Sequence, residues 1–244
     1  MKGLTVSIRT FVFALLFSAP VWLLAQNSPL VHLGDNSDWW SQLRADDSGL
    51  DVTVQKREPS ASNFKILGIN LGEGLFRKAA TKLGEAQSMQ RGDASTGRYQ
   101  ICYVSAGDHP QRIHLVLETG EVSDWFYLFS GGPDWKGSEL CVKSNLVTEN
   151  SSVASGLHLG QTPAEVKAIL GKPSAVIGNK IIYSFGVQKK TSPSDFAKLR
   201  QQNPKLSEEE LRRDYELYSL GVYIEARFTQ SKLSYLAVSK AETY

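Results

Sequence analysis

Two stretches of the chain repeat the same order of apolar and polar residues. The stretch SGLHLGQTPAEVKAILGKPSAV at 155–176 holds two Leu-Gly pairs at a helix-sized spacing, and ILGINLGEGLFRKAATKLGEA at 66–86 holds two more. Between the pairs, apolar residues recur every three or four positions, which is the period of an α-helix with one buried face. Each stretch therefore predicts a helix, with an apolar face of Val166, Ile169 and Leu170 in the later copy and of Phe76, Ala79, Ala80 and Leu83 in the earlier one.

The later copy also carries clear signals for where its helix starts and stops. Thr162 suits the N-cap, Pro163 suits the first helical position, and Glu165 completes a capping box with Thr162. Gly171 and Pro173 then end the helix.

Strand patterns follow each helix. Residues 97–105 and 179–187 each read as one strand, and 112–129 and 223–238 each alternate apolar and polar residues on both sides of a short turn. Connections of hairpin length join antiparallel strands only. The repeated unit is therefore a helix followed by three antiparallel strands.

This pattern predicts an α+β protein of two tandem units, each with a short helical segment packed on its own three- to four-stranded antiparallel sheet. The first unit spans 61–148 and the second 149–244. The second unit has an insertion at 191–218 that predicts two more helices, one opened by Ser192 or Ser194 and one by Ser207. Each helix is expected to pack on its own hairpin, with Val166, Ile169 and Leu170 against Ile224, Ala226 and Phe228.

The N-terminus is typical of a secretory signal. Residues 1–25 combine basic Lys2 and Arg9 with an apolar run that ends just before Ala25. We expect cleavage near Ala25 and a secreted or periplasmic protein with no stable membrane insertion afterwards. The large Leu23 leaves an uncleaved anchor as the alternative, because a small residue is usual at that position. The following segment, 26–60, is polar and turn-rich, and we expect it to be weakly ordered.

Charge narrows the class of partner. The chain has 27 basic and 25 acidic residues. Removing 1–25 removes two basic residues and no acidic ones, which leaves a net charge of zero. A neutral chain without a basic run lacks the electrostatic footprint that nucleic acids or anionic membranes require. We therefore expect no nucleic-acid partner.

Cys102 and Cys141 lie in segments that both read as strand. In an exported chain such a pair predicts a disulfide, with two buried thiols as the alternative. Neither interpretation makes the cysteines catalytic, because no CxxC motif or nearby His accompanies them.

An enzymatic site has little support in the sequence. The candidate groups would be Asp93, Asp108, His109, His114 and Glu118. His114 and Glu118 are four residues apart on a strand, which separates them by about 13 Å and prevents them from sharing a metal ion. We therefore predict no metal, no cofactor and no catalysis.

The helix signature in the later copy resembles that of a family of exported modules. This family includes the small outer-membrane assembly lipoprotein of the β-barrel assembly machinery and, with the unit doubled, β-lactamase inhibitory protein. The pattern G-x-T-x-x-E-V-x-x-x-L-G-x-P is matched by Gly160, Thr162, Glu165, Val166, Leu170, Gly171 and Pro173. The earlier copy departs from it at Gly74, Lys78 and Ala86. The resemblance implies a non-catalytic protein that offers the open face of its sheet to another macromolecule.

Strand alternation indicates which residues would form that face. If Leu117 lies opposite Val122 and Phe228 opposite Leu233, the face away from the helices shows His114, Trp125, Tyr127, Tyr223, Glu225, Arg227 and Leu236. Aromatic residues and Arg are enriched at protein interfaces, so we expect an exported or envelope protein as partner. Two alternatives stay open: the face packs on DWWSQL at 38–43, or the protein is an envelope small-ligand receptor or hydrolase.

Overall fold

The structure is a computed structural model of the chain. It describes residues 31–32, 43, 52–91, 97–107, 112–131 and 140–244. The signal segment 1–25 lies outside these residues. In the part of the chain that is described, no helix is both long enough and apolar enough to cross a membrane.

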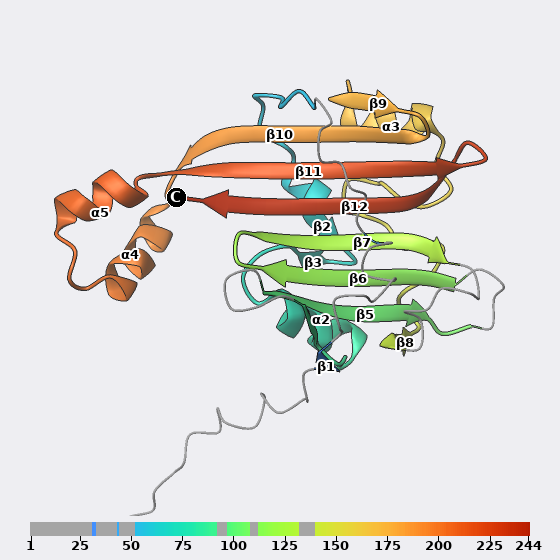
Figure 1. Cartoon of the computed structure of the whole chain (residues 1–244), viewed down its shortest axis with the longest axis horizontal. Coiled ribbons are helices and arrows are strands. Elements are labelled where there is room, and N and C mark those ends of the chain that lie inside the picture. Colours follow the sequence, from blue (N-terminus) through green and yellow to red (C-terminus); the bar gives the residue numbers. More distant parts are fainter. Residues whose placement is uncertain (1–30, 33–42, 44–51, 92–96, 108–111, 132–139) are drawn as a thin grey trace, which may run out of the picture.

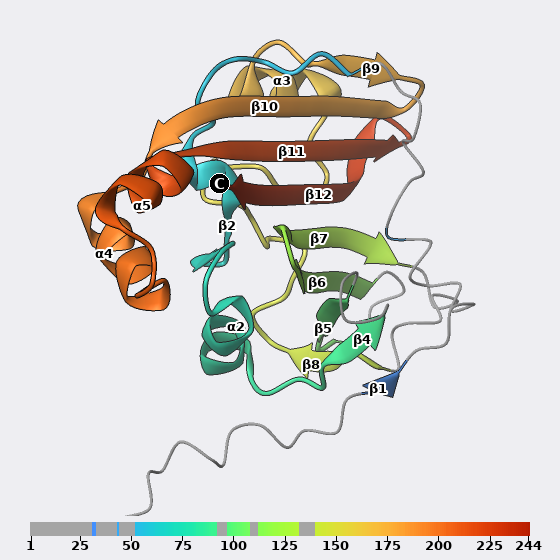
Figure 2. The same cartoon turned by 60° about the vertical axis from the view of Figure 1, so that its left-hand side comes forward.

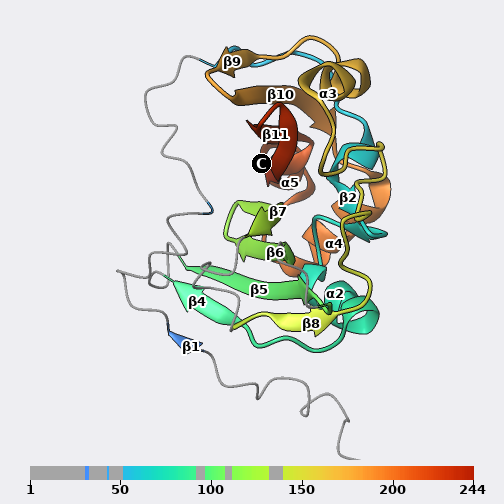
Figure 3. The ribbon, with the colours of Figure 1, turned by 90° about the vertical axis from the view of Figure 1, so that its right-hand side faces the viewer.

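One large sheet dominates the described chain (Figure 1), and helices lie against one of its faces (Figure 3). The helical elements are the 3-10 helix η2 (Ala61–Phe64), α2 (Leu75–Leu83), α3 (Pro163–Leu170), α4 (Pro193–Gln202) and α5 (Glu208–Tyr215). The sheet runs, in spatial order, through β1 (Val31–His32), β4 (Met89–Arg91), β5 (Arg98–Ser105), β6 (Arg112–Gly120), β7 (Ser123–Gly131), β12 (Lys232–Thr243), β11 (Leu217–Thr229), β10 (Lys180–Lys190) and β9 (Ala175–Ile177). In addition β8 (Val142–Ser144) pairs with β5, and β2 (Lys65–Ile66) pairs with β3 (Ile69–Asn70).

The expectation of two small tandem sheets is wrong, because the halves join into one sheet. Strand β7 pairs antiparallel with β12 from Tyr235 opposite Phe129 to Ala241 opposite Ser123. Two separate sheets would have left both strands with unpaired edges, which this pairing removes. The long strands pair antiparallel with one another as expected, whereas the short pairs β1–β4 and β5–β8 and the isolated bridge between Gln55 and Phe185 are parallel.

Both repeat helices pack on the same face of this sheet (Figure 3). In α3 the Thr162 and Glu165 capping box is present, and Val166 and Leu170 are buried as predicted. Ile169 is 37% exposed, so its predicted burial is wrong. The helix is short, and the two residues four apart suffice to cover the sheet beneath it.

The earlier copy forms its helix with a different start and a shifted face. Its N-cap is Gly74, which adopts a left-handed conformation and supplies no capping side chain. The buried positions of α2 are Leu75, Ala79 and Leu83, each four residues apart, while Phe76 is only partly buried. Side chains of both helices belong to one continuous core with Leu117, Leu128, Ile224 and Leu236 from the central strands.

The predicted insertion between β10 and β11 forms two helices, α4 and α5, that extend beyond the ends of the strands (Figures 1 and 2). Ser192 and Ser207 are the N-caps, as the sequence indicates. Leu211 is the buried side chain of α5, and the Arg212 guanidinium lies 5.4 Å from the centre of the Phe196 ring.

Residues 52–60 run along the outer edge of β10. The Gln55 amide donates to the Ser184 carbonyl at 2.8 Å, and the Gly186 amide donates to the Gln55 carbonyl at 3.1 Å. Arg57 Nη2 donates to the Leu170 carbonyl at 2.7 Å, which ties this segment to the end of α3. The expectation of weak order for 26–60 therefore fails for these residues, which protect a sheet edge.

The shared core predicts that the two halves unfold together. Replacing Leu170 by Ala in α3 removes buried contacts and should lower the free energy of unfolding by about 2 to 5 kcal/mol. Amide hydrogen exchange measured over a urea series should show the same loss of protection in β6 of the first half and in β11 of the second. Protection that falls in the second half alone would contradict a single cooperative core.

Candidate functional site

Six of the seven residues predicted for a binding face project from one face of the sheet, opposite α2 and α3; Leu236 is the exception. Directly paired residues on adjacent strands share a face. Read from β6 to β11, the pairs form three rows: Glu118, Trp125, Ser239 and Tyr223; Val116, Tyr127, Ala237 and Glu225; His114, Phe129, Tyr235 and Arg227.

Leu236 belongs to the opposite side. The turn between β6 and β7 is shorter than expected, but Leu117 pairs with Phe126 and keeps the assumed face. In the second hairpin the register shifts between Arg227 and Phe228. This bulge reverses the faces of β12 and places Leu236 in the core under the helices.

The centre of the predicted face is buried. His114 and Tyr127 have no exposed surface, and Glu225 is 3% exposed. Leu43, the last residue of DWWSQL, packs in the same cluster as Tyr127, and the Tyr235 hydroxyl donates to its carbonyl. The alternative of packing within the chain is therefore supported for Leu43, while Trp39 and Trp40 lie outside the described residues.

The remaining three residues of the predicted face are partly exposed. The Trp125 ring stacks on Tyr127 with 5.7 Å between ring centroids, and its centroid lies 6.0 Å from that of Tyr223. Arg227 pairs with the buried Glu225 carboxylate and lies 4.0 Å from the centre of the Tyr235 ring. Removing a charge from water is unfavourable unless it is paired, so Arg227 has a structural role here.

The residues considered for catalysis also have structural partners. Glu118 Oε2 accepts hydrogen bonds from Gln100 Nε2 at 2.5 Å and from the Tyr127 hydroxyl at 3.4 Å. The His114 ring stacks on Phe129 with centroids 5.1 Å apart. Asp93, Asp108 and His109 lie outside the described residues. Among the residues that are described, no three His, Cys, Asp or Glu side chains are grouped as metal ligands.

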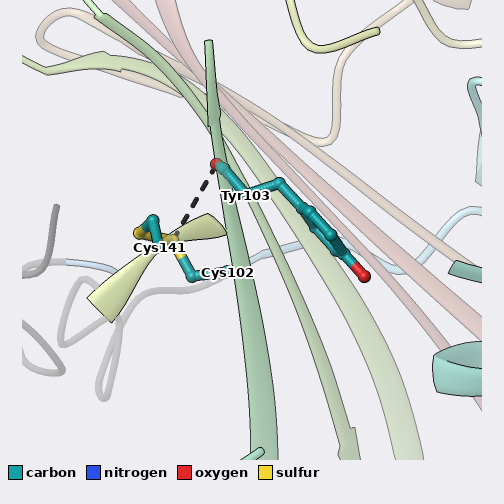
Figure 4. The surroundings of a disulfide bond; sticks show 3 residues. All are labelled: Cys102, Tyr103 and Cys141. Carbon is teal, nitrogen blue, oxygen red and sulfur yellow. Dashed lines mark hydrogen bonds between the residues drawn. A yellow bond between two sulfur atoms is a disulfide. The ribbon is translucent and has the colours of Figure 1, made fainter. Parts of the chain in front are cut away.

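The disulfide between Cys102 and Cys141 is present, as the sequence predicts. Figure 4 shows Cys102 and Tyr103 on opposite sides of β5, with Cys102 directed toward Cys141. Tyr103 lies in the core beneath the helices, and its hydroxyl donates to the Gly84 carbonyl at 2.8 Å. The bridge is consistent with an oxidising compartment. It also fixes β8, which begins at the next residue, against β5.

A groove of about 1440 Å³ lies at the end of the sheet to which β8 leads. Four parts of the chain surround it: the end of β5 with the start of β6, the end of β7, the connection at 145–150 with 158–160, and the β11–β12 hairpin. The lining residues are Ser105, Ala106, Gly107, Ile113, Phe129, Ser130, Asn145, Val147, Thr148, Glu149, Asn150, His158, Leu159, Gly160, Thr229, Gln230, Lys232, Leu233, Ser234 and Tyr235.

Backbone hydrogen bonds hold one wall of this groove. The Leu233 amide donates to the Gln161 carbonyl at 2.7 Å, and the Gly160 amide donates to the Leu233 carbonyl at 2.8 Å. The pairing of β12 with β7 stops at Tyr235 and Phe129. Residues 158–161 therefore approach β12 just where β7 leaves it, and the two strand ends open into the groove.

A smaller cavity of about 410 Å³ lies in the equivalent place of the first half. It lies between Gly72–Arg77, which precedes and opens α2, and the β6–β7 turn at Thr119–Asp124. In the second half the corresponding parts are His158–Gly160 and the β11–β12 turn. The strand patterns predicted both hairpins and their turns, but they assigned no role to the connection at 145–150, so the larger groove was missed.

Comparison of the chain with family profiles, with curated proteins and with solved structures finds no match. The resemblance in the helix signature thus rests on the residues that carry it.

The buried His114 predicts a loss of stability in acid. Burial lowers the pKa of His114 to about 4, whereas the pKa of imidazole in an unfolded chain is about 6.5. The folded state binds this proton less readily than the unfolded state does. The free energy of unfolding therefore keeps its full value above the unfolded pKa and decreases as the pH falls from that value to the folded pKa. The loss from this group should be roughly 3 kcal/mol, because one pKa unit is worth about 1.4 kcal/mol.

A His114→Phe variant tests this assignment, since it keeps a ring against Phe129 but does not titrate. Urea unfolding of both proteins at neutral pH and near the folded pKa should show a smaller acid loss in the variant. An identical loss in both proteins would mean that other groups cause the acid sensitivity.

The disulfide predicts a local effect on the groove wall. A Cys102→Ala, Cys141→Ala double variant should lower the free energy of unfolding by about 2 to 4 kcal/mol. Hydrogen exchange should rise first at Val142–Ser144, whose pairing with β5 the bridge secures. Thiol titration of the denatured, unreduced wild type should find no free thiol, and two thiols would refute the bridge.

Proposed function

We propose that this protein is a non-catalytic binding module of the extracytoplasmic space, and that its partner, an exported or envelope protein, docks at the groove. The groove carries this proposal. It is formed by strand ends from both halves of the sheet, and it combines apolar side chains with hydroxyl and amide groups, as binding sites do.

The burial of the aromatic face supports moving the partner from that face to the groove. Tyr127 and Glu225 are buried in its centre, and Leu43 of the same chain packs there. Phe129 and Tyr235 join the two regions, since both belong to the last row of the face and both line the groove. A partner in the groove would therefore lie beside the row of Phe129, Tyr235 and Arg227 without displacing the residues buried at the centre of the face.

The roles of the candidate catalytic groups support a non-catalytic function. Glu118 is held by Gln100 and Tyr127, and the His114 ring stacks on Phe129. Side chains engaged in this way stabilise the face of the sheet. The disulfide and the N-terminal signal pattern support an exported location. A small-ligand receptor is the second candidate, because the same groove also brings polar groups together.

Site-specific photo-crosslinking tests the proposal. A benzoylphenylalanine placed at Asn150, in the groove wall, should crosslink an envelope protein in cells that produce this chain. The same probe at Glu121 is the control and should give no such product. Glu121 lies in the β6–β7 turn beside the smaller cavity, and this turn corresponds to the β11–β12 turn of the groove.

A second substitution separates the candidate functions. Lys232→Trp should fill part of the groove and abolish the crosslink from Asn150, while Glu121→Trp should leave it intact. Equal products from both probe positions would refute the groove as the docking site. No product at all, together with a small molecule that raises the melting temperature of the wild type but not of Lys232→Trp, would favour the receptor.

A further inference from the structure

The size of the groove points to a ligand longer than a metabolite. Pockets for small molecules usually enclose about 300 to 1000 Å³, and this groove encloses about 1440 Å³. It also crosses several elements, from Ser105 at the end of β5 to Thr229 at the end of β11. A polymeric ligand would contact this whole length.

The charges of the lining argue against a charged polymer. Its described residues include one carboxylate, Glu149, and one ammonium group, Lys232, besides the imidazole of His158. Nucleic acids and other polyanions require an excess of basic groups. A polycation would require the opposite excess. The balance favours an uncharged ligand.

The polar groups of the lining suit a polypeptide backbone. An extended peptide presents N–H donors and C=O acceptors in turn along its length. Hydroxyl and amide side chains both donate and accept, and the lining contains several of them, including Ser130, Asn145 and Asn150. Such residues also supply adaptable hydrogen bonding in antibody binding sites.

The apolar and aromatic groups favour a peptide over a saccharide. Saccharide rings pack on exposed aromatic faces, but Phe129 and Tyr235 are only 6% and 9% exposed. Leu159 is also part of the lining and is partly buried. These groups form shallow apolar contacts for alternate side chains of an extended chain.

We propose that the groove binds an extended, uncharged segment of a partner polypeptide, with polar contacts to its backbone and apolar contacts to alternate side chains. This rests on the proposed function, because it specifies the part of the partner that enters the groove. A folded partner surface or a saccharide would be a different ligand.

Selection from a random dodecapeptide library on the disulfide-bonded protein tests the proposal. Enriched peptides should contain few charged residues. Their synthetic forms should bind the Asn150→Trp variant roughly tenfold or more weakly, a change of about 1.4 kcal/mol. The control Glu121→Trp, beside the smaller cavity, should bind them as the wild type does.

The salt dependence of binding provides an independent measure. Raising the salt concentration from about 50 mM to about 500 mM should change the affinity for these peptides by less than about threefold, because an uncharged ligand makes no ion pair that salt could screen. A loss of tenfold or more, or selection of mainly acidic or basic peptides, would overturn the uncharged ligand. Peptides that bind Asn150→Trp as well as the wild type would overturn the groove as their site.

The outcomes for this inference and for the proposed function are distinguishable. If the Asn150 probe crosslinks a partner but no peptide from the library binds, the partner docks through a folded surface and the inference is wrong. If neutral oligosaccharides bind the wild type and not Asn150→Trp, the ligand is a saccharide and the proposed ligand class is wrong. If peptides bind in the groove but no partner is crosslinked, the inference holds and the proposed partner is wrong.

Discussion

The pairing of β7 with β12 is the constraint on which the rest of the structure depends. It joins β7, the last long strand of the first half, to β12, the last strand of the second, so that six long strands form one sheet. The helices α2 and α3 then share one core instead of two. The same pairing sets the groove, because β7 and β12 separate beyond Phe129 and Tyr235, and the Gly160–Gln161 backbone bonds to Leu233 there.

A continuous sheet has two faces to cover, and the chain covers them differently. The helices bury apolar side chains on one face. The opposite face contains buried polar groups, which are tolerated only when they have partners. Glu225 has Arg227 and Lys180, and Glu118 has Gln100 and Tyr127. Leu43 and the disulfide add apolar cover at Tyr127 and Cys102. The face is therefore an internal packing surface at its centre.

The sequence predicted local structure well and long-range pairing poorly, for physical reasons. Caps such as Thr162 and Ser207 act within one turn of a helix, so their residue types alone indicate where α3 and α5 begin. The face of each strand residue follows from alternation. The pairing expected across the β6–β7 turn was wrong by an even number of residues, so His114 and Trp125 stayed on the correct face. The bulge at Arg227 changed the count by one and reversed Leu236. No local signal identifies which edge strands of two similar units will pair, so the joined sheet was missed.

The groove was not foreseen because its two walls come from different levels of organisation. One wall belongs to the repeat: Gly160 with the β11–β12 turn corresponds to Gly72 with the β6–β7 turn, and each pair encloses a cavity. The other wall is the connection between the halves at 145–150, and the smaller cavity has no counterpart of this connection. Val147 anchors that connection in the core, and the disulfide holds β8, from which it emerges. An almost symmetric fold thus acquires one large groove, because the connection lines this groove and not the smaller cavity.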